Sequence, residues 1–214
     1  MANIEEFGFD RDDIQPFRFK RYKGKTGKTD RVGIVFADGQ APCIGANCHF
    51  KERYFLCKST AEKKEICCLH SYDGNIPKKR IACVLVVYDI AEKDGKRSLR
   101  GYELLPWIFN EAMYQKMRVI GKEWPLDKHD INLTCTNDEF QNIEANPAKE
   151  CYWRSDVKLQ KKILTDAVKV RESLARQLGS DLSITEIREQ LGVDAPGVDD
   201  AAVDVSLGDV VQNI

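Results

Sequence analysis

The chain has 214 residues, of which 43% are hydrophobic and 31% charged, a composition that supports one domain of ordinary size with at most a small appendage. No apolar stretch approaches the roughly 18 residues of a membrane-spanning helix, and the acidic segment 1–13 lacks the apolar core of a secretory signal. Eight cysteines without such a signal favour a reducing compartment, where thiols bind metals or pack in cores.

The net charge of −1 conceals an uneven distribution. Residues 15–31 contain seven basic side chains and one acidic side chain, whereas residues 193–214 contain five acidic side chains and no base. When the five negative charges of residues 193–214 are removed from the net charge of −1, residues 1–192 carry a net charge of +4. A basic body with an acidic tail indicates a polyanionic partner and a tail that competes with it; the alternative is a solvated surface with a disordered end.

The first half of the chain shows strand patterns. Residues 16–22 alternate aromatic and basic side chains, and a turn-rich loop at 23–28 leads to an apolar run at 31–36, which together predict a hairpin with a cationic tip. A further strand is predicted at 52–57. The longest apolar run, at 79–88, predicts a strand that is buried on both faces.

Turn signals and periodicity divide the second half. Asp94-Gly95 predicts a hairpin turn to a partner strand at 98–105, and Pro106 predicts the start of a helix that ends near Trp124-Pro125. Three more strands are predicted, at 131–136, 140–145 and 151–155.

The pattern at 157–178 predicts an amphipathic helix capped by Asp156 and ended by Gly179. Ser183 and Glu186 form a capping-box pattern for a short helix that ends at Gly192.

The predicted class is therefore α+β, with an OB-fold-like β-barrel that suits short strands joined by hairpins. We expect an acidic N-terminal segment at 1–14, a binding core at 15–155 with an inserted zinc subdomain at about 43–76, a helical extension at 156–192, and an acidic, disordered tail at 193–214.

Metal-ligating residues are concentrated between positions 49 and 70, a run that holds two of the three histidines and three of the eight cysteines. Two residues separate Cys67 from His70, the knuckle spacing that a tetrahedral zinc accepts. The candidate ligands of one structural Zn²⁺ are His49, Cys57, Cys67, Cys68 and His70, and Cys48 is an alternative. Core cysteines are the competing interpretation, but the segment is otherwise polar. Cys43, Cys83, Cys135 and Cys151 are expected to be packing residues.

Basic and aromatic residues are interleaved in a pattern that suits single-stranded nucleic acid, which needs cations for the phosphates and ring faces for the bases. The candidate DNA-binding residues are Phe17, Arg18, Lys20, Arg21, Tyr22, Lys23, Lys25, Lys28, Arg53, Tyr54, Tyr72, Lys78, Lys79, Arg80, Arg97, Arg100 and Tyr102. About half of the aromatic residues are expected to face the core, because one face of an alternating strand is buried.

The order of these parts resembles the zinc-containing single-stranded DNA-binding (helix-destabilising) proteins of T-even-like tailed phages. The resemblance covers residues 15–155 and the tail. It rests on the pattern at 17–36, the spacing of His49, Cys57, Cys67 and His70, the strand around 84–87 with the Trp107 segment, and the strand at 131–135. His70 stands where the family usually has cysteine, which leaves Cys67, Cys68 and His70 as candidates for two ligand positions. The acidic N-terminus lacks the family's basic self-association arm.

The resemblance implies a protein that coats single-stranded DNA without sequence preference during phage replication, recombination and repair, in the cytoplasm of an infected bacterium. It further implies that the acidic tail recruits replication or recombination proteins. The alternative is a zinc-stapled transcription or protein-interaction module. We expect no enzymatic activity, because no carboxylate cluster and no nucleophile–base pair stands out.

Overall fold

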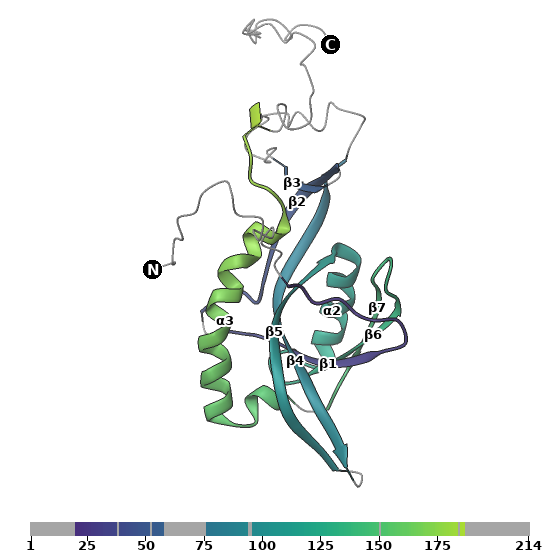
Figure 1. Ribbon diagram of the computed structural model, residues 1–214, viewed down its shortest axis with the longest axis vertical. Helices are drawn as coiled ribbons and strands as arrows, with labels where there is room; N and C mark the ends of the chain where they lie inside the picture. Colours follow the sequence, from purple (N-terminus) through teal and green to yellow (C-terminus); the bar gives the residue numbers. More distant parts are fainter. Residues whose placement is uncertain are drawn as a thin grey trace, which may run out of the picture.

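The computed structural model describes residues 20–37, 39–51, 53–57, 76–93, 96–149, 151–183 and 185–186. These residues form an α+β fold, as predicted, in which a large antiparallel sheet is flanked by helices (Figure 1). The strands are β1 (Thr29–Ile34), β2 (Cys43–Lys51), β3 (Arg53–Leu56), β4 (Lys78–Lys93), β5 (Lys96–Asn110), β6 (Ile131–Asn137) and β7 (Asn142–Pro147), and the helices are α2 (Glu111–Glu123), the short 3₁₀ helix η1 (Tyr152–Arg154) and α3 (Val157–Leu178).

Strand β4 is the centre of the fold. Its residues 81–86 are all buried, which confirms the prediction of a strand covered on both faces. Because successive side chains point to opposite faces, Cys83 and Leu85 join an apolar cluster with α2, whereas Val84 and Val86 join a second cluster with α3. In Figure 1, α3 covers one side of the long β4–β5 hairpin and α2 lies on the other.

Strand β5 pairs with β4 along nearly its whole length, and Lys93 stands opposite Lys96 across the predicted turn. The helix predicted from Pro106 is present as α2 and ends before Trp124 as expected, but its predicted start is wrong, because β5 continues to Asn110 and α2 begins at Glu111. The apolar residues alternate with period two: Trp107 packs in the α2-side cluster and Ile108 in the α3-side cluster. The Pro106 carbonyl points away from β4 and accepts from Tyr22 N on the outer edge of β5. The proline nitrogen points the same way, so the lack of an N–H group there costs no hydrogen bond to β4.

Helix α3 has the predicted limits. The Asp156 carboxylate accepts from the backbone N–H groups of Lys158 and Leu159, at 2.6 and 3.2 Å, and the helix ends at Leu178 before Gly179. A side chain at Gly179 would lie 3.2 Å from backbone atoms of β3, so this glycine permits close approach of the two segments. The predicted capping box is also confirmed, by reciprocal bonds between Ser183 and Glu186 of 2.7 and 3.2 Å.

The strands are arranged in the order β3-β2-β4-β1-β6-β7, with β5 on the other edge of β4. Strands β2 and β1 therefore lie end to end along one edge of β4. Among the described strands, β5 pairs only with β4, and β7 only with β6, so the sheet is barrel-like but not closed.

The segment 20–28 crosses the open side of this sheet. Tyr22 N donates to Pro106 O of β5, and Gly27 N donates to Cys135 O of β6, both at 2.9 Å. The Gln141 side chain binds the backbone of Gly24: its Oε1 accepts from Gly24 N at 3.0 Å, and its Nε2 donates to Gly24 O at 3.2 Å. The predicted hairpin between 16–22 and 31–36 is wrong in its described part: residues 20–22 form no strand, and β1 pairs instead with β4 and β6.

Three shorter segments also differ from the predicted secondary structure. Residues 152–154 form η1 rather than a strand, and Trp153 is buried there. The strand predicted at 140–145 begins two residues later, as β7, because 138–141 form the turn from β6. The strand prediction at 52–57 is confirmed by β3, but its partner β2 was not predicted.

Several predictions lie outside the described residues, namely those for 1–19, for 58–75 and for 187–214. None of the helices that the structure describes is both long enough and apolar enough to cross a bilayer.

Candidate nucleic-acid interface

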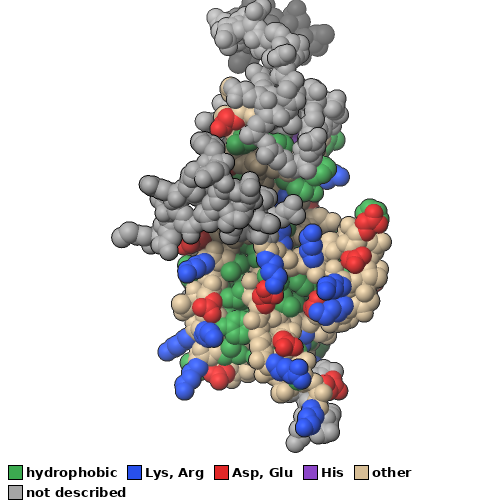
Figure 2. Space-filling model, in the orientation of Figure 1, with side chains coloured by type: hydrophobic (Ala, Val, Ile, Leu, Met, Phe, Trp, Pro, Cys, Tyr) green, Lys and Arg blue, Asp and Glu red, His purple; other side chains and the backbone are tan. Residues whose placement is uncertain are grey.

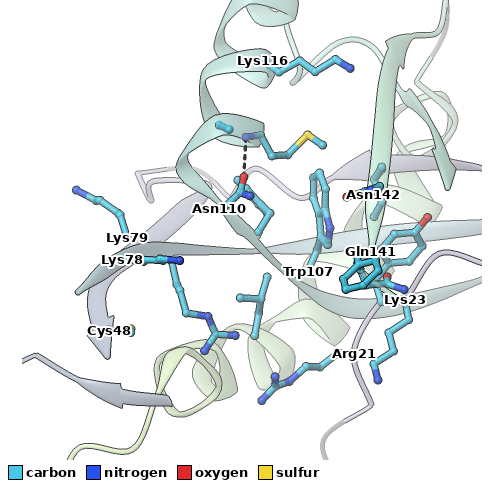
Figure 3. Close-up of a pocket in the computed structure, with 18 of the residues that line it drawn as sticks. Arg21, Lys23, Cys48, Lys78, Lys79, Trp107, Asn110, Lys116, Gln141 and Asn142 are labelled. Carbon is cyan, nitrogen blue, oxygen red and sulfur yellow. Dashed lines mark hydrogen bonds between the residues drawn. The ribbon is translucent and has the colours of Figure 1, made fainter. Parts of the chain in front are cut away.

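An open cleft of about 1000 Å³ lies where the segment 21–23, the β2–β3 hairpin, the start of β4, the end of β5, the start of α2 and the β6–β7 hairpin meet. Figure 3 shows its two walls, with Lys78, Lys79 and Cys48 on one side and Lys23, Gln141 and Asn142 on the other. Trp107 and Asn110 lie between these walls, and Lys116 projects from α2. The cleft is thus formed by segments far apart in the sequence.

The charge of the cleft is strongly one-sided. Its lining contains six basic residues, Arg21, Lys23, Lys78, Lys79, Arg80 and Lys116, and a single acidic one, Glu144. Figure 2 shows Lys and Arg side chains interspersed with Asp and Glu beside hydrophobic surface on one face of the molecule, so the excess of basic residues belongs to the cleft lining. Such a concave basic surface concentrates anions.

Arg80 is fixed in place by neutral groups. Its guanidinium lies 3.5 Å from the centroid of the Tyr54 ring and donates to the main-chain carbonyl of Leu178 at the end of α3. Burial lowers the pKa of Arg80 from its ordinary value, yet an arginine remains a cation at neutral pH. A cation at a helix C-terminus is also favoured by the helix dipole.

Arg21 lies near the same helix end, where its Nε donates to Gln177 Oε1 at 3.1 Å. The residue as a whole is exposed, but partial burial of the guanidinium lowers its pKa. Within the described residues, neither Arg21 nor Arg80 forms an ion pair with a carboxylate. Both charges therefore remain available to an anionic ligand.

Aromatic side chains complete the lining. Phe50 and Tyr54 face each other across the β2–β3 pair with ring centroids 4.9 Å apart, and Phe140 projects from the β6–β7 turn. Phe50 is 56% exposed and Phe140 is 70% exposed. Of the seven large hydrophobic side chains described as exposed, four line this cleft: Phe50, Tyr54, Ile76 and Phe140. Exposed rings in a basic cleft are the surface on which unpaired bases stack.

Seven of the candidate DNA-binding residues meet in the cleft: Arg21, Tyr22, Lys23, Tyr54, Lys78, Lys79 and Arg80. Tyr22 is mostly core, since it is 6% exposed, packs edge-on against Trp107 and donates to Asp30 Oδ2.

Other candidates lie elsewhere. Lys20 pairs with Glu103 and Lys28 with Asp30, and the Tyr102 hydroxyl donates to Asp166 on α3. Lys25 and Arg100 do not line the cleft either. Phe17, Arg18 and Tyr72, and the side chains of Arg53 and Arg97, are outside what the structure describes.

Among the aromatic and basic residues of the lining, sequence reasoning missed five: Phe50, Trp107, Phe109, Lys116 and Phe140. Phe50 and Phe140 carried a usable signal, because each is a large apolar residue within a polar stretch. Lys116 carried none, since its place in the cleft depends on how α2 packs.

The candidate zinc ligands are only partly described. His49 on β2 is fully buried, and Cys57 N donates to Asn47 O at 2.8 Å. Continuing the β2–β3 register places Cys57 opposite Asn47. Asn47 precedes His49 by two residues, so Cys57 and His49 lie on the same face of the hairpin.

That face is the one opposite Phe50 and Tyr54. Cys67, Cys68 and His70 lie outside the described residues, and among those described no three His, Cys, Asp or Glu side chains are grouped to hold a metal. Cys48, the alternative ligand, lines the cleft instead, and its thiol donates to Leu178 O at 3.6 Å.

No protein-family model matches this chain. No curated protein matches it with significant similarity either.

Proposed function

We propose that the protein binds single-stranded DNA in this cleft without sequence preference. The observation that carries the proposal is the combination of six basic residues, one acid and four exposed hydrophobic side chains in one open cleft. Lys and Arg side chains would contact the phosphates and release counterions, while Phe50 and Phe140 would stack bases. No bond is broken, so the function is binding alone.

The biological role follows from the resemblance to phage helix-destabilising proteins. Coating of transient single strands would protect them and remove hairpins during replication, recombination and repair. An OB-fold-like arrangement of the open sheet is part of this proposal, because such sheets present a groove to single strands. The acidic tail at 193–214 would compete with DNA for the basic cleft and recruit replication or recombination proteins.

A structural zinc belongs to the same proposal. His49 and Cys57 share one face of the β2–β3 hairpin, whose other face carries Phe50 and Tyr54 into the cleft. Zinc held by these two residues and two of Cys67, Cys68 and His70 would stiffen the hairpin that forms one wall. Its role would be structural, because four protein ligands leave no open position for catalysis.

The test is a fluorescence-anisotropy titration of labelled oligo-dT at salt concentrations between about 50 and 200 mM. We expect the logarithm of the association constant to fall linearly with the logarithm of the salt concentration. The slope should be about −4 if all six basic side chains contact phosphates. Mixed-sequence single strands should bind with similar affinity. A preference for duplex DNA would favour the transcription-module alternative, and absence of nucleic-acid binding would favour a protein-interaction module.

A further inference from the structure

We propose that the last turn of α3 is a charge-preserving anchor, in which Gln177 and the Leu178 carbonyl aim Arg21 and Arg80 into the cleft without neutralising them. The inference rests on the proposed DNA-binding function and assigns Gln177 as a positioning residue for it. Neither the predicted ligand residues nor the resemblance to phage proteins includes this helix.

The geometry centres on the Gln177 amide. The residue is 2% exposed, and both ends of its amide are used: Oε1 accepts from Arg21 Nε at 3.1 Å, and Nε2 donates to Ser173 Oγ at 2.9 Å. Ser173 Oγ in turn donates to Val170 O at 2.6 Å. A buried amide held at both ends has one orientation, so it can fix the direction of the arginine that it binds.

A polar residue at this position is not explained by packing. Gln177 lies between Leu174 and Leu178, which are buried in the apolar cluster between α3 and the sheet. An apolar side chain would continue that cluster, whereas a buried amide is costly unless it is hydrogen-bonded. Its outward partner is a cation that lines the cleft, which gives the amide a reason to be there.

Basic residues elsewhere in the described structure have both kinds of partner. Outside the cleft, Lys20, Lys28 and Arg31 pair with the carboxylates of Glu103, Asp30 and Asp130, whereas Arg118, Arg154 and Arg171 donate to neutral oxygens. Inside it, Arg21 and Arg80 are held by an amide oxygen and a main-chain carbonyl oxygen. A carboxylate would cancel the charge that a phosphate needs, while a neutral oxygen orients the guanidinium and leaves its charge intact.

The helix end also offsets the cost of bringing the two cations together. Arg21 lies close enough to lower the pKa of Arg80, although burial is the larger cause. The C-terminal end of a helix carries a partial negative charge, so α3 stabilises two like charges that would otherwise separate.

The experiment measures oligo-dT affinity and its salt dependence for Gln177→Leu and Gln177→Glu. Gln177→Leu should weaken binding about threefold to tenfold, because Arg21 keeps its charge but loses its orientation. Gln177→Glu keeps the shape and an acceptor for Arg21 but adds a negative charge. It should weaken binding at least as much and make the salt slope less steep by about 0.7, the value of one phosphate contact on a single strand.

Two controls separate positioning from folding. Gln160→Leu makes the same chemical change in the first turn of α3, about 25 Å along the helix, and should leave affinity unchanged. In an Arg21→Ala background, Gln177→Leu should have no further effect, since the two residues act as a unit.

The wild-type titration distinguishes the two proposals. If the wild type binds and Gln177→Glu binds equally well, the anchor is overturned while the DNA-binding function stands. Additive effects of Arg21→Ala and Gln177→Leu would also overturn it. If the wild type does not bind, both proposals fail.

Discussion

At the scale of single residues, the two aromatic side chains of the β2–β3 hairpin have different roles. One face of the Tyr54 ring is covered by Arg80, at 3.5 Å from its centroid, and its neighbour Phe50 lies 4.9 Å away. Tyr54 therefore supports the cleft wall, whereas Phe50 is 56% exposed and lines the cleft where a base would bind. Residue type alone does not separate these roles.

Replacing Phe50 by alanine should weaken oligo-dT binding by about 1–3 kcal/mol, the usual contribution of one stacked base. Stability should change little, because the ring is exposed. The measurements are an anisotropy titration and a thermal melt. Val119→Ala is the matched control, since Val119 is a similarly exposed apolar residue on α2 that does not line the cleft. Equal affinities of the wild type and Phe50→Ala would exclude stacking at this position.

The buried Tyr88 hydroxyl donates to Asp130 Oδ1 at 2.9 Å and accepts from Trp153 N at 3.1 Å. Tyr88→Phe leaves both partners without this hydroxyl and should lower the free energy of unfolding by about 1–3 kcal/mol. Tyr102→Phe, which removes an exposed hydroxyl bond to Asp166, should change it by less than about 0.5 kcal/mol. Urea unfolding at neutral pH measures both.

The effect of Tyr88→Phe should depend on pH. Burial, and secondarily the Asp130 carboxylate, raise the pKa of Tyr88 above its ordinary value, which is about 10 in an unfolded chain. Above about pH 10 the unfolded state loses this proton while the folded state retains it, so wild-type stability falls as the pH rises. Tyr88→Phe lacks this loss, so the difference in the free energy of unfolding between the wild type and Tyr88→Phe should become smaller above about pH 10. A constant difference up to about pH 11 would contradict the raised pKa.

At the level of elements, the β2–β3 hairpin lines the cleft, and the end of α3 supports it from outside the lining. Ser180 exchanges backbone bonds with Tyr54 and Leu56 of β3, at 2.8 and 3.0 Å, so the chain after α3 extends the edge of the hairpin. The hairpin thus has one face toward the cleft, an edge tied to α3, and a far face that carries His49 and Cys57. A zinc on that face would hold the element in place from behind.

The purified protein should contain about one zinc per chain, and Cys57→Ser should reduce that content because it removes a thiolate ligand. Metal analysis after dialysis measures both. Chelation should also make the hairpin more susceptible to proteolysis, since zinc binding contributes folding free energy. Cys135→Ser is the matched control, because Cys135 is a buried thiol of β6 far from the candidate ligands in sequence. A wild-type zinc content well below one per chain would contradict the site.

At the scale of the whole molecule, the distribution of charge decides what the protein attracts. The chain carries a net −1, but five acids are confined to 193–214 and the cleft is lined by six basic residues. Under the proposed function, the acidic tail would compete with DNA for the cleft. The competition should weaken as salt screens it.

Truncation before Val193 should tighten oligo-dT binding severalfold at low salt, and the gain should shrink as salt rises toward about 200 mM. Anisotropy titrations of the two proteins measure this gain. Removal of Gln212, Asn213 and Ile214 alone deletes no charged side chain and should leave affinity unchanged. Unchanged affinity after the full truncation would rule out competition by the tail.

Elements with local signals could be predicted from the sequence. Helix α3 lies between the predicted Asp156 cap and Gly179, the Ser183–Glu186 box forms, and β4 is buried on both faces. Caps, turns and periodicity act between residues a few positions apart, so a single sequence records them directly. The same holds for the basic and aromatic composition that pointed to nucleic acid.

Which of those residues come into contact depends on the three-dimensional packing of the chain. Strand β1 pairs with β4 and β6 rather than with its sequence neighbour, the Trp107 segment extends a strand rather than opening a helix, and Arg21 meets Gln177 from 156 positions away. Strand pairing and helix docking depend on burial of surfaces distant in sequence, for which no local signal exists. For that reason the cleft, and the neutral oxygens that hold Arg21 and Arg80 in it, are properties of the fold.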